Sequence, residues 1–412
     1  MIGHKKVIVI GGGPAGLSAA VALKEKGLDD ILILEREPRL GGILNQCIHD
    51  GFGLTRFGES LSGPEYAERF VARAKELQID YITDCTVIDI SGERLVTAVR
   101  HGELLEFTCD AVLLTMGCRE RPRGALAIPG DRPAGVFTAG VAQAYINLKN
   151  TMVGREIVIL GSGDIGMIMA RRMTLEGAKV KAVFEIQPYP SGLPRNIQQC
   201  LKDYDIPLFL SHTVTRINGR ERLESVTVSQ VDENMRPIPG TEETWECDTL
   251  ILSVGLIPEN ELSLKAGVEL DGRTKGALVD EHHQTGVPGV FAAGNVLHVH
   301  DLVDFVSLEA EEMASAVLEY LAGGLAECSI PVETDEHIGY TVPQTVSGKR
   351  DVKISFRPRR PMENCVFKVL QGSAVIATKK VRRAIPAIME HIEVGAEAFL
   401  SEEPIKVVCV NG

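Results

Sequence analysis

The chain has 412 residues, a length that predicts two or three domains. Apolar residues make up 44% of it and charged residues 24%, which excludes a disordered or collagen-like chain. Its net charge of -13 argues against nucleic acid and anionic membranes as partners.

The distribution of cysteines and apolar runs indicates a cellular compartment. Nine cysteines are scattered along the chain and never spaced as CxxC, which favours a reducing environment and argues against a zinc or iron–sulfur site. No apolar run reaches the roughly 20 residues of a membrane helix, and the first one is too short for a signal peptide. We therefore expect a cytoplasmic enzyme without a membrane span.

The first expected element is a buried strand at 7–10, followed by a glycine-rich turn and a helix. The segment Val7–Ala20 reads VIVIGGGPAGLSAA, and a second strand pattern at 31–34 ends at Glu35. In a unit of this kind the pyrophosphate of a dinucleotide rests on the helix N-terminus, and the acid accepts hydrogen bonds from the ribose. The segment predicts one dinucleotide site.

The same unit recurs later in the chain. The segment Ile157–Ala170 reads IVILGSGDIGMIMA, and a following strand pattern at 179–184 ends at Glu185. Both acids lie 24 residues after the first glycine of their turn, so the two copies are in register. This repeat predicts a second dinucleotide site, in which the carboxylate of Glu185 would repel a 2′-phosphate and favour NADH.

Several further segments resemble those of the two-dinucleotide flavoprotein superfamily, in the same order. They are Arg36 with Gly41 and Gly42, Leu113–Gly117, Ile128–Gly130, Asp248–Pro258 and Val290–Val296. The resemblance implies an α/β fold with two Rossmann-like domains, one for FAD and one for NAD(H). The expected divisions are an FAD domain at 1–118 and 259–330, an NAD(H) domain at 119–258, and a C-terminal β domain at 331–412.

The resemblance also assigns cofactor-binding residues position by position. For FAD they are Gly11, Gly13, Pro14, Ala15, Gly16, Glu35, Arg36, Gly42, Val87, Thr115, Gly117, Gly294, Asn295, Leu302 and Val303. For NAD(H) they are Gly161, Gly163, Asp164, Ile165, Gly166, Glu185 and Gly255. Asn295 departs from the superfamily, which usually has aspartate there, but its amide can still bond the ribityl chain.

The C-terminal segment predicts a small antiparallel β domain. Five strand patterns occur in it, at Ile338–Val342, Val352–Phe356, Cys365–Leu370, Ala374–Thr378 and Ile405–Val410. Between Lys349 and Arg383 there are 11 basic and 2 acidic residues. This basic run is either a solvated strand face or a docking surface for an acidic partner, with Arg357, Arg359 and Arg360 as candidate contacts.

Three longer strings resemble a narrower family along nearly the whole chain. They are GGILNQCIHDGFG, TMGCRERPRG and GNVLHVHDLVDFVS. The family comprises bacterial FAD/NAD(P)-dependent oxidoreductases associated with a glycerol-3-phosphate dehydrogenase-like flavoprotein, and it is related to small FAD subunits of opine and proline dehydrogenases. It implies an NADH oxidase-like enzyme that passes electrons to oxygen or a partner. The alternative is an electron-transfer subunit that reduces NAD+.

The same resemblance implies partner subunits, and the C-terminal domain, which adds no chemistry to a complete FAD/NAD core, suggests a docking or oligomer contact. The expected partners are the glycerol-3-phosphate dehydrogenase-like subunit and a small cysteine-rich protein, and the C-terminal domain would hold a subunit or form a homo-oligomer.

Two clusters remain open to more than one interpretation. Cys47 and His49 fall where relatives keep a redox disulfide, so Cys47 is either a redox-active thiolate, its pKa lowered by His49, or a packing residue. His298, His300, Asp301 and Asp304 form a polar cluster near the expected flavin edge. We predict hydrogen bonding there and no metal.

Overall fold

A computed structural model describes residues 2–91 and 93–411. The chain forms two compact units, one from residues 1–118 and 258–412 and the other from residues 119–257. Where the chain passes between them, the short strands β9 (Cys118–Glu120) and β18 (Leu256–Pro258) pair with each other. Among the described residues, no helix is long and apolar enough to cross a membrane.

The first unit is built on a mixed sheet in the order β5-β2-β1-β8-β7-β6, with β19 added beside β8. The bounds are β1 (Ile2–Ile10), β2 (Ile31–Leu34), β5 (Asp80–Ile82), β6 (Cys85–Ile90), β7 (Leu95–Arg100), β8 (Glu103–Leu114) and β19 (Val290–Ala292). β1, β2, β5, β8 and β19 pair in parallel, whereas β6, β7 and β8 form an antiparallel meander. The nucleotide-binding half is therefore the parallel one.

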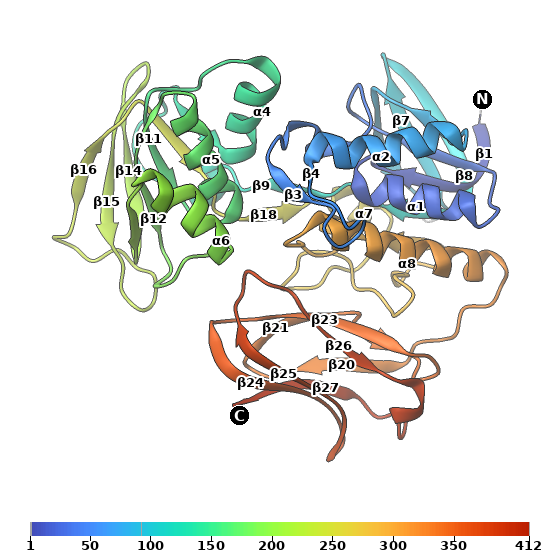
Figure 1. The fold of residues 1–412 in the computed structure, drawn as a ribbon. Helices are drawn as coiled ribbons and strands as arrows, with labels where there is room; N and C mark the ends of the chain where they lie inside the picture. Colours follow the sequence, from blue (N-terminus) through green and yellow to red (C-terminus); the bar gives the residue numbers. More distant parts are fainter. Residues whose placement is uncertain (1, 92, 412) are drawn as a thin grey trace. The chain divides into compact units, whose positions relative to one another are not determined.

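Three helices pack on one face of this sheet: α1 (Pro14–Glu25), α2 (Gly63–Glu76) and α8 (Val303–Leu321) (Figure 1). Val7 and Val9 of β1 face these helices, whereas Ile8 and Ile10 face a second core on the other side. This run of four buried residues is typical of a strand covered on both faces. Ser62 and Glu65 form a capping box that fixes where α2 begins.

The C-terminal part of the same unit contains two sheets around a core of its own. Their orders are β22-β20-β27-β24-β25 and β21-β23-β26. The bounds are β20 (Ile330–Thr334), β21 (Ile338–Val342), β22 (Thr345–Val346), β23 (Val352–Pro358), β24 (Met362–Gln371), β25 (Ala374–Ala384), β26 (Glu390–Val394) and β27 (Ile405–Asn411).

The structure differs from three sequence-based predictions about this region. Three strands were not expected: β20 contains Pro331, β22 has only two residues, and β26 carries glutamates between its apolar residues. The sheet is also not wholly antiparallel, because β20 pairs in parallel with β27. Ile330, expected at the end of the FAD domain, is a buried member of the C-terminal core.

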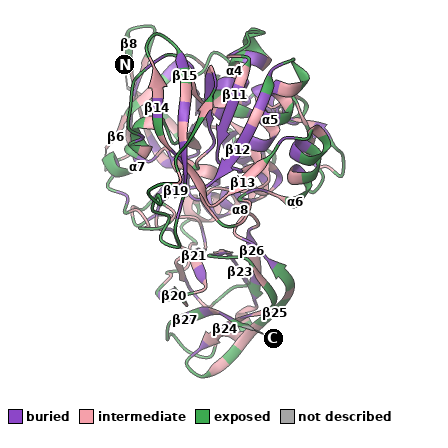
Figure 2. Ribbon diagram, turned by 90° about the vertical axis from the view of Figure 1, so that its left-hand side faces the viewer, coloured by how far each residue is buried: buried purple, intermediate pink, exposed green. Residues whose placement is uncertain are grey.

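The second unit has a parallel sheet in the order β10-β17-β11-β12-β13 and an antiparallel sheet β14-β15-β16. The bounds are β10 (Val136–Thr138), β11 (Glu156–Leu160), β12 (Lys179–Glu185), β13 (Leu208–Leu210), β14 (His212–Gly219), β15 (Leu223–Gln230), β16 (Glu243–Glu246) and β17 (Thr249–Leu252). Helices α4 (Ala139–Lys149) and α5 (Asp164–Leu175) cover one face of the parallel sheet. Figure 2 shows β11 and β12 largely buried, as expected of its central strands.

Candidate functional site: two dinucleotide cradles

The first glycine-rich turn leaves space that a side chain would fill. Gly11 has a φ of +105°, and a Cβ there would lie 2.6 Å from the carbonyl oxygen of Thr115. A Cβ on Gly16 would collide with the carbonyl oxygen of Gly11. The hydroxyl of Thr115 donates to the carbonyl oxygens of Ile10 (2.8 Å) and Gly11 (3.1 Å). The turn, α1 and the end of β8 are thus held in close contact.

Next to this turn, the backbone allows a pyrophosphate to approach. α1 begins at Pro14, and Gly13 provides no side-chain cap, so the N–H groups of its first turn remain for an anion. A Cβ on Gly42 would lie 3.0 Å from Cα of Gly13, which brings the double glycine to the same turn. These features fit FAD, as the sequence predicted.

Glu35 ends β2 beside the turn and is buried. Its Oε2 accepts a 2.6 Å hydrogen bond from the backbone N–H of Gly12, and its Oε1 accepts one of 2.8 Å from Glu37. Each carboxylate oxygen has a second lone pair, so the group can still accept a ribose hydroxyl. The backbone N–H of Cys85 donates to the carbonyl oxygen of Glu35, and Val87 follows two residues later on β6.

The segment Val290–Val296, expected to contact FAD, approaches the first glycine-rich turn at α1. A Cβ on Gly294 would lie 2.9 Å from Cβ of Ala15. Oδ1 of Asn295 accepts a hydrogen bond from the backbone N–H of His300 (3.0 Å), and its Nδ2 lies 3.6 Å from Sγ of Cys118. Leu302 precedes the first residue of α8, Val303, so both lie at the N-terminal end of a long helix.

Two other expected FAD residues are less enclosed. The side chain of Arg36 is 60% exposed and lies 4.0 Å from Glu259. Gly117 has a φ of +72° and open space around the position of a Cβ. The contacts of the described residues therefore bring Gly11, Gly13, Gly16, Glu35, Gly42, Thr115 and Gly294 together, while Arg36, Val87 and Gly117 lie at the margin.

We call the first site, formed by Gly11, Gly16, Glu35 and Thr115, the first cradle. A second cradle with the same arrangement lies in the other unit, around Gly161, Gly166 and Glu185. Gly161 has a φ of +100°, and a Cβ there would collide with the carbonyl oxygen of Ser253. A Cβ on Gly166 would lie 2.6 Å from the carbonyl oxygen of Gly161 and 2.7 Å from Cβ of Ser253. Ser253 therefore takes the place that Thr115 has in the first cradle. Sequence reasoning missed it, although both residues directly follow a buried strand that pairs with the glycine-turn strand.

Glu185 at the end of β12 is more heavily bonded than Glu35. Its Oε2 accepts hydrogen bonds from the backbone N–H of Ser162 (3.0 Å) and from the hydroxyls of Ser162 (2.6 Å) and Ser191 (2.7 Å). Its Oε1 accepts one from Gln187 (2.9 Å). The carboxylate is buried and fixed, so a 2′-phosphate at this position would meet an immobile negative charge.

The other expected NAD(H) residues lie in the first turn of α5 and in the loop at Gly255, and Asp164 bonds the segment around Leu193. Oδ1 of Asp164 accepts hydrogen bonds from the backbone N–H of Leu193 (2.8 Å) and from the side-chain amide of Asn196 (2.6 Å). Gly163 precedes α5 without a side-chain cap, as Gly13 precedes α1, and Ile165 is half-buried in the first turn. Gly255 has a φ of +98°, and its carbonyl oxygen accepts from Arg121.

The geometry around Cys47 disagrees with the expectation of a thiolate. Burial raises the pKa of its thiol to about 12, and its Sγ lies 3.4 Å from the carbonyl oxygen of Ile43. The ring of His49 packs on Phe52, with centroids 4.9 Å apart. Of the two interpretations that the sequence left open, the packing residue is therefore favoured over the thiolate, because desolvation moves the pKa of Cys47 upward.

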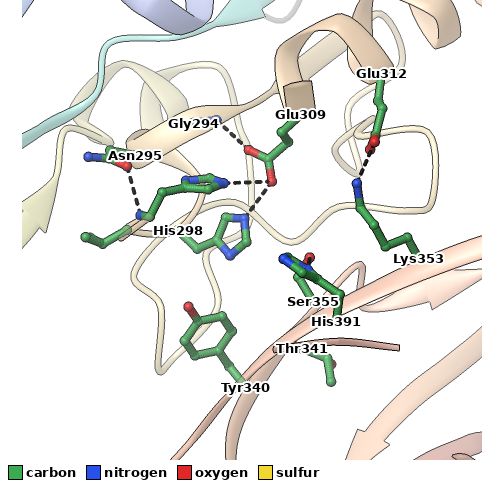
Figure 3. Close-up of polar contacts among 12 residues, drawn as sticks. Gly294, Asn295, His298, Glu309, Glu312, Tyr340, Thr341, Lys353, Ser355 and His391 are labelled. Atoms are coloured by element: carbon green, nitrogen blue, oxygen red, sulfur yellow. Dashed lines mark hydrogen bonds and ion pairs between the residues drawn. The ribbon is translucent and has the colours of Figure 1, made fainter. Parts of the chain in front are cut away.

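The expected cluster near the flavin edge is also rearranged. Asp304 points to a different loop, where its carboxylate accepts hydrogen bonds from the backbone N–H groups of Gly53, Thr55 and Arg56 at 2.7–3.0 Å. His298 and His300 instead approach Glu309, which sequence reasoning missed (Figure 3). The signal was available, because Glu309 lies on the helix that directly follows the two histidines.

Comparison with known proteins gives a family match over most of the chain. The family model described as pyridine nucleotide-disulphide oxidoreductase matches residues 5–316. Hydrogen cyanide synthase subunit HcnB of Pseudomonas protegens is 26% identical over 316 residues, which make up 70% of this chain and 65% of the relative. The glutamate synthase [NADPH] small chain of Mycobacterium tuberculosis is 27% identical over 358 residues, covering 78% of this chain and 67% of the relative.

The fold is also similar to a solved structure. The crystal structure of T. acidophilum thioredoxin reductase superposes with a TM-score of 0.64 and 23% identity, covering 78% of this chain and 99% of that chain. This likeness confirms the predicted α/β fold with two Rossmann-like sheets.

Proposed function

The chain belongs to the pyridine nucleotide-disulphide oxidoreductase family, which binds FAD and NAD(P)H, and on that premise we propose a more specific reaction. The protein takes hydride from NADH onto FAD and passes the electrons to oxygen or to a partner subunit in the cytoplasm. The observation that carries the proposal is the second cradle, which repeats the first and encloses the fixed carboxylate of Glu185.

When bound, FAD accepts hydride from a nicotinamide and hands electrons onward. The chain supplies binding and orientation. The N-termini of α1 and α5 offer backbone N–H groups to the two pyrophosphates, and Glu35 and Glu185 accept hydrogen bonds beside the ribose positions. Leu302 and Val303 lie at the N-terminal end of the 19-residue α8, whose positive dipole would stabilise negative charge on a reduced flavin bound there.

The route by which electrons leave is not an internal disulfide in this proposal. The string after the double glycine, GGILNQCIHDGFG, contains one cysteine, and the second unit has no CxxC. The raised pKa of Cys47 supports a packing role for this residue. Oxygen or another subunit therefore takes the electrons.

An alternative function is favoured by the names of two relatives, one a synthase subunit and the other a small chain. According to this alternative, the protein is an electron-transfer subunit that reduces NAD+. It receives its electrons from a partner dehydrogenase that oxidises glycerol-3-phosphate, an opine or proline. A glycerol-3-phosphate dehydrogenase-like flavoprotein and a small cysteine-rich protein are the proposed partners, on the strength of the sequence resemblance.

Anaerobic titration separates the two functions. The purified chain, alone and with the candidate partner subunit, is titrated with NADH, NADPH and glycerol-3-phosphate while flavin absorbance is followed. Bleaching by NADH with the chain alone supports the leading proposal. Bleaching by glycerol-3-phosphate that requires the partner supports the alternative, and no bleaching by either nicotinamide contradicts both.

A further inference from the structure

His298, His300 and Glu309 bring three potential metal ligands to one point. Nε2 of His298 lies 2.6 Å from Oε1 of Glu309, and Nε2 of His300 lies 3.4 Å from the same oxygen. One ligand atom from each residue lies within 4.8 Å of the other two. Both histidines follow Gly294–Val296, and Glu309 lies in the second turn of α8, where the backbone N–H of Gly294 donates to it; this hydrogen bond joins the two elements that carry the group.

The three side chains are almost completely shielded from solvent. Their exposed fractions are 1% for His298, 3% for His300 and 9% for Glu309. Among the described residues, Nδ1 of His298 and Nδ1 of His300 have no hydrogen-bond partner. In both rings it is the other nitrogen, Nε2, that faces Glu309 and would bind an ion, and a proton on Nδ1 would then donate to a buried water.

When both imidazoles are neutral, no cationic side chain among the described residues contacts the carboxylate of Glu309. Among the described residues it contacts the two imidazoles and the backbone N–H of Gly294, which donates to Oε2 at 2.6 Å (Figure 3). The nearby cations are engaged elsewhere: Arg357 donates to the carbonyl oxygen of Val299, and Lys353 pairs with Glu312. Since buried carboxylates are normally paired with a cation or a metal, a positive ion would complete this site.

A cavity of about 250 Å³ opens beside the group. Its lining includes His300 and Glu309 from the FAD-binding part, and Lys353, Ser355 and His391 from the C-terminal sheets. Because a water molecule occupies about 30 Å³ in the liquid, the cavity has room for a coordinated water and a small molecule.

We propose that His298, His300 and Glu309 bind a divalent transition-metal ion, zinc by ligand chemistry, with one coordination position facing the cavity. Two histidines and a glutamate with an open fourth position are a known zinc ligand set. Tetrahedral bonds of about 2.0–2.1 Å separate ligand atoms by about 3.3 Å. The pair His300 and Glu309 already has this spacing, and the pair His298 and Glu309 opens by about 0.7 Å on binding.

A second group of possible ligands, Glu281, His282 and Cys328, is less suited to an ion. Glu281 accepts hydrogen bonds from the backbone N–H and the hydroxyl of Ser347, and Nδ1 of His282 lies 3.2 Å from Arg350. An ion would have to displace these contacts and approach the guanidinium. This group therefore provides the control.

Metal binding by the FAD-loaded protein tests the proposal. The protein is dialysed against a chelator, supplied with Zn2+ and analysed for zinc per chain, with affinity measured against a chromophoric chelator. We expect one zinc per chain in the wild type. His300→Ala and Glu309→Gln should each weaken binding by more than about 100-fold, because a direct ligand matters more than its outer partners.

Two controls separate loss of the ligand from general damage. Cys328→Ser alters the second group, and His283→Ala removes another histidine that lines the cavity, and both should keep stoichiometric zinc. Flavin absorbance at each step shows that a variant is folded and loaded. The conservative variant His300→Asn is used if His300→Ala loses FAD. A wild type that binds no zinc at micromolar free metal overturns the proposal, as do His300 and Glu309 variants that retain stoichiometric zinc.

Discussion

The backbone N–H of Gly12 donates a 2.6 Å hydrogen bond to Oε2 of Glu35, which couples the glycine-rich turn to the acid at the end of the next strand. The carboxylate thereby shapes the turn, and we expect it also to accept a hydrogen bond from the ribose of bound FAD. We expect Glu35→Gln to weaken FAD binding by about 1–3 kcal/mol, since an amide presents a donor where Gly12 and Glu37 also donate. The dissociation constant of FAD from the apoprotein measures the effect.

Glu37 provides the matched control for that change. Its side chain is 62% exposed, and its part in the Glu35 contact is the backbone N–H, which a substitution leaves in place. Glu37→Gln should therefore leave FAD affinity unchanged. Equal FAD affinities for Glu35→Gln and the wild type would show that Glu35 does not contribute to binding.

Discrimination between NADH and NADPH should depend on Glu185. Four hydrogen bonds fix this buried carboxylate where a 2′-phosphate would lie, so NADH should be preferred by about 1–3 kcal/mol. Glu185→Gln keeps the size of the side chain and removes its charge, and the preference should shrink. Rates of flavin bleaching at subsaturating nucleotide give the ratio, with the exposed Glu243→Gln as control. Equal rates of the wild type with both nucleotides would contradict this role.

The two cradles were predictable from the sequence because their requirements are local. Gly11 and Gly161 need a positive φ, and Gly16 and Gly166 lie too close to neighbouring backbone for a side chain. These requirements select glycine at a fixed spacing that is visible in the sequence. Thr115 was predictable by resemblance. Ser253, which has the same place in the second cradle, was not, because several small residues could fill that contact.

The surroundings of the histidines were not predictable in the same way. Asp304 and Glu309 lie on one helix, five residues apart, yet Asp304 holds the loop at Gly53 and Glu309 meets His298. Helical periodicity places such residues on different faces, but only tertiary packing decides which face meets the histidines. For the same reason, the nearness of His49 in the sequence could not decide whether Cys47 is a thiolate or a packing residue, whereas its burial in the fold favours packing.

Cys47→Ser should leave NADH-dependent bleaching of the flavin unchanged under anaerobic conditions. Burial raises the pKa of this thiol far above pH 7, so the thiol stays protonated and a thiolate cycle is not expected. In air, the wild type and the variant should produce the same amount of hydrogen peroxide per NADH. A variant that produces more peroxide than the wild type would show that Cys47 takes part in oxygen reduction.

The pKa of His391 predicts how stability depends on pH. Burial lowers this pKa from 6.5 to about 4, and the positive charges of Lys353 and Lys379 and the rings of His300 and His298 act in the same direction. The unfolded chain then binds a proton between pH 6.5 and pH 4 that the folded chain excludes. Stability therefore falls as pH falls through this window, by as much as about 3 kcal/mol from this residue.

Thermal unfolding of a His391 variant checks that dependence. The difference in Tm between pH 7.5 and pH 4.5 should be smaller for His391→Asn than for the wild type, because the variant has no proton to bind there. His101→Asn is the control, since His101 is exposed and asparagine tolerates its positive φ of 49°. A His391 variant with an unchanged pH difference would contradict the prediction.

The basic run of the C-terminal domain divides into structural and exposed residues. Arg357 was expected to contact a partner, but its side chain is only 16% exposed and donates to Val299, Pro386 and Tyr340. A partner contact is not expected of Arg357, because its side chain is bonded within the chain: the contact with Val299 joins the C-terminal sheets to the FAD-binding part, and those with Pro386 and Tyr340 lie within the C-terminal region. Arg357→Glu should lower Tm whether or not a partner is present.

We predict that an acidic partner binds strand β25, because this strand ends its sheet and exposes three cations, Lys380, Arg382 and Arg383. Charges on such an edge steer an oppositely charged subunit, and salt screens the attraction over about 10 Å at 0.1 M. Changing all three to Glu should abolish co-purification of the partner subunit at low salt while leaving the flavin spectrum and NADH bleaching intact. The wild-type complex should itself weaken as salt is raised. If the triple variant assembles as well as the wild type at every salt concentration, β25 is a solvated face and the partner binds elsewhere.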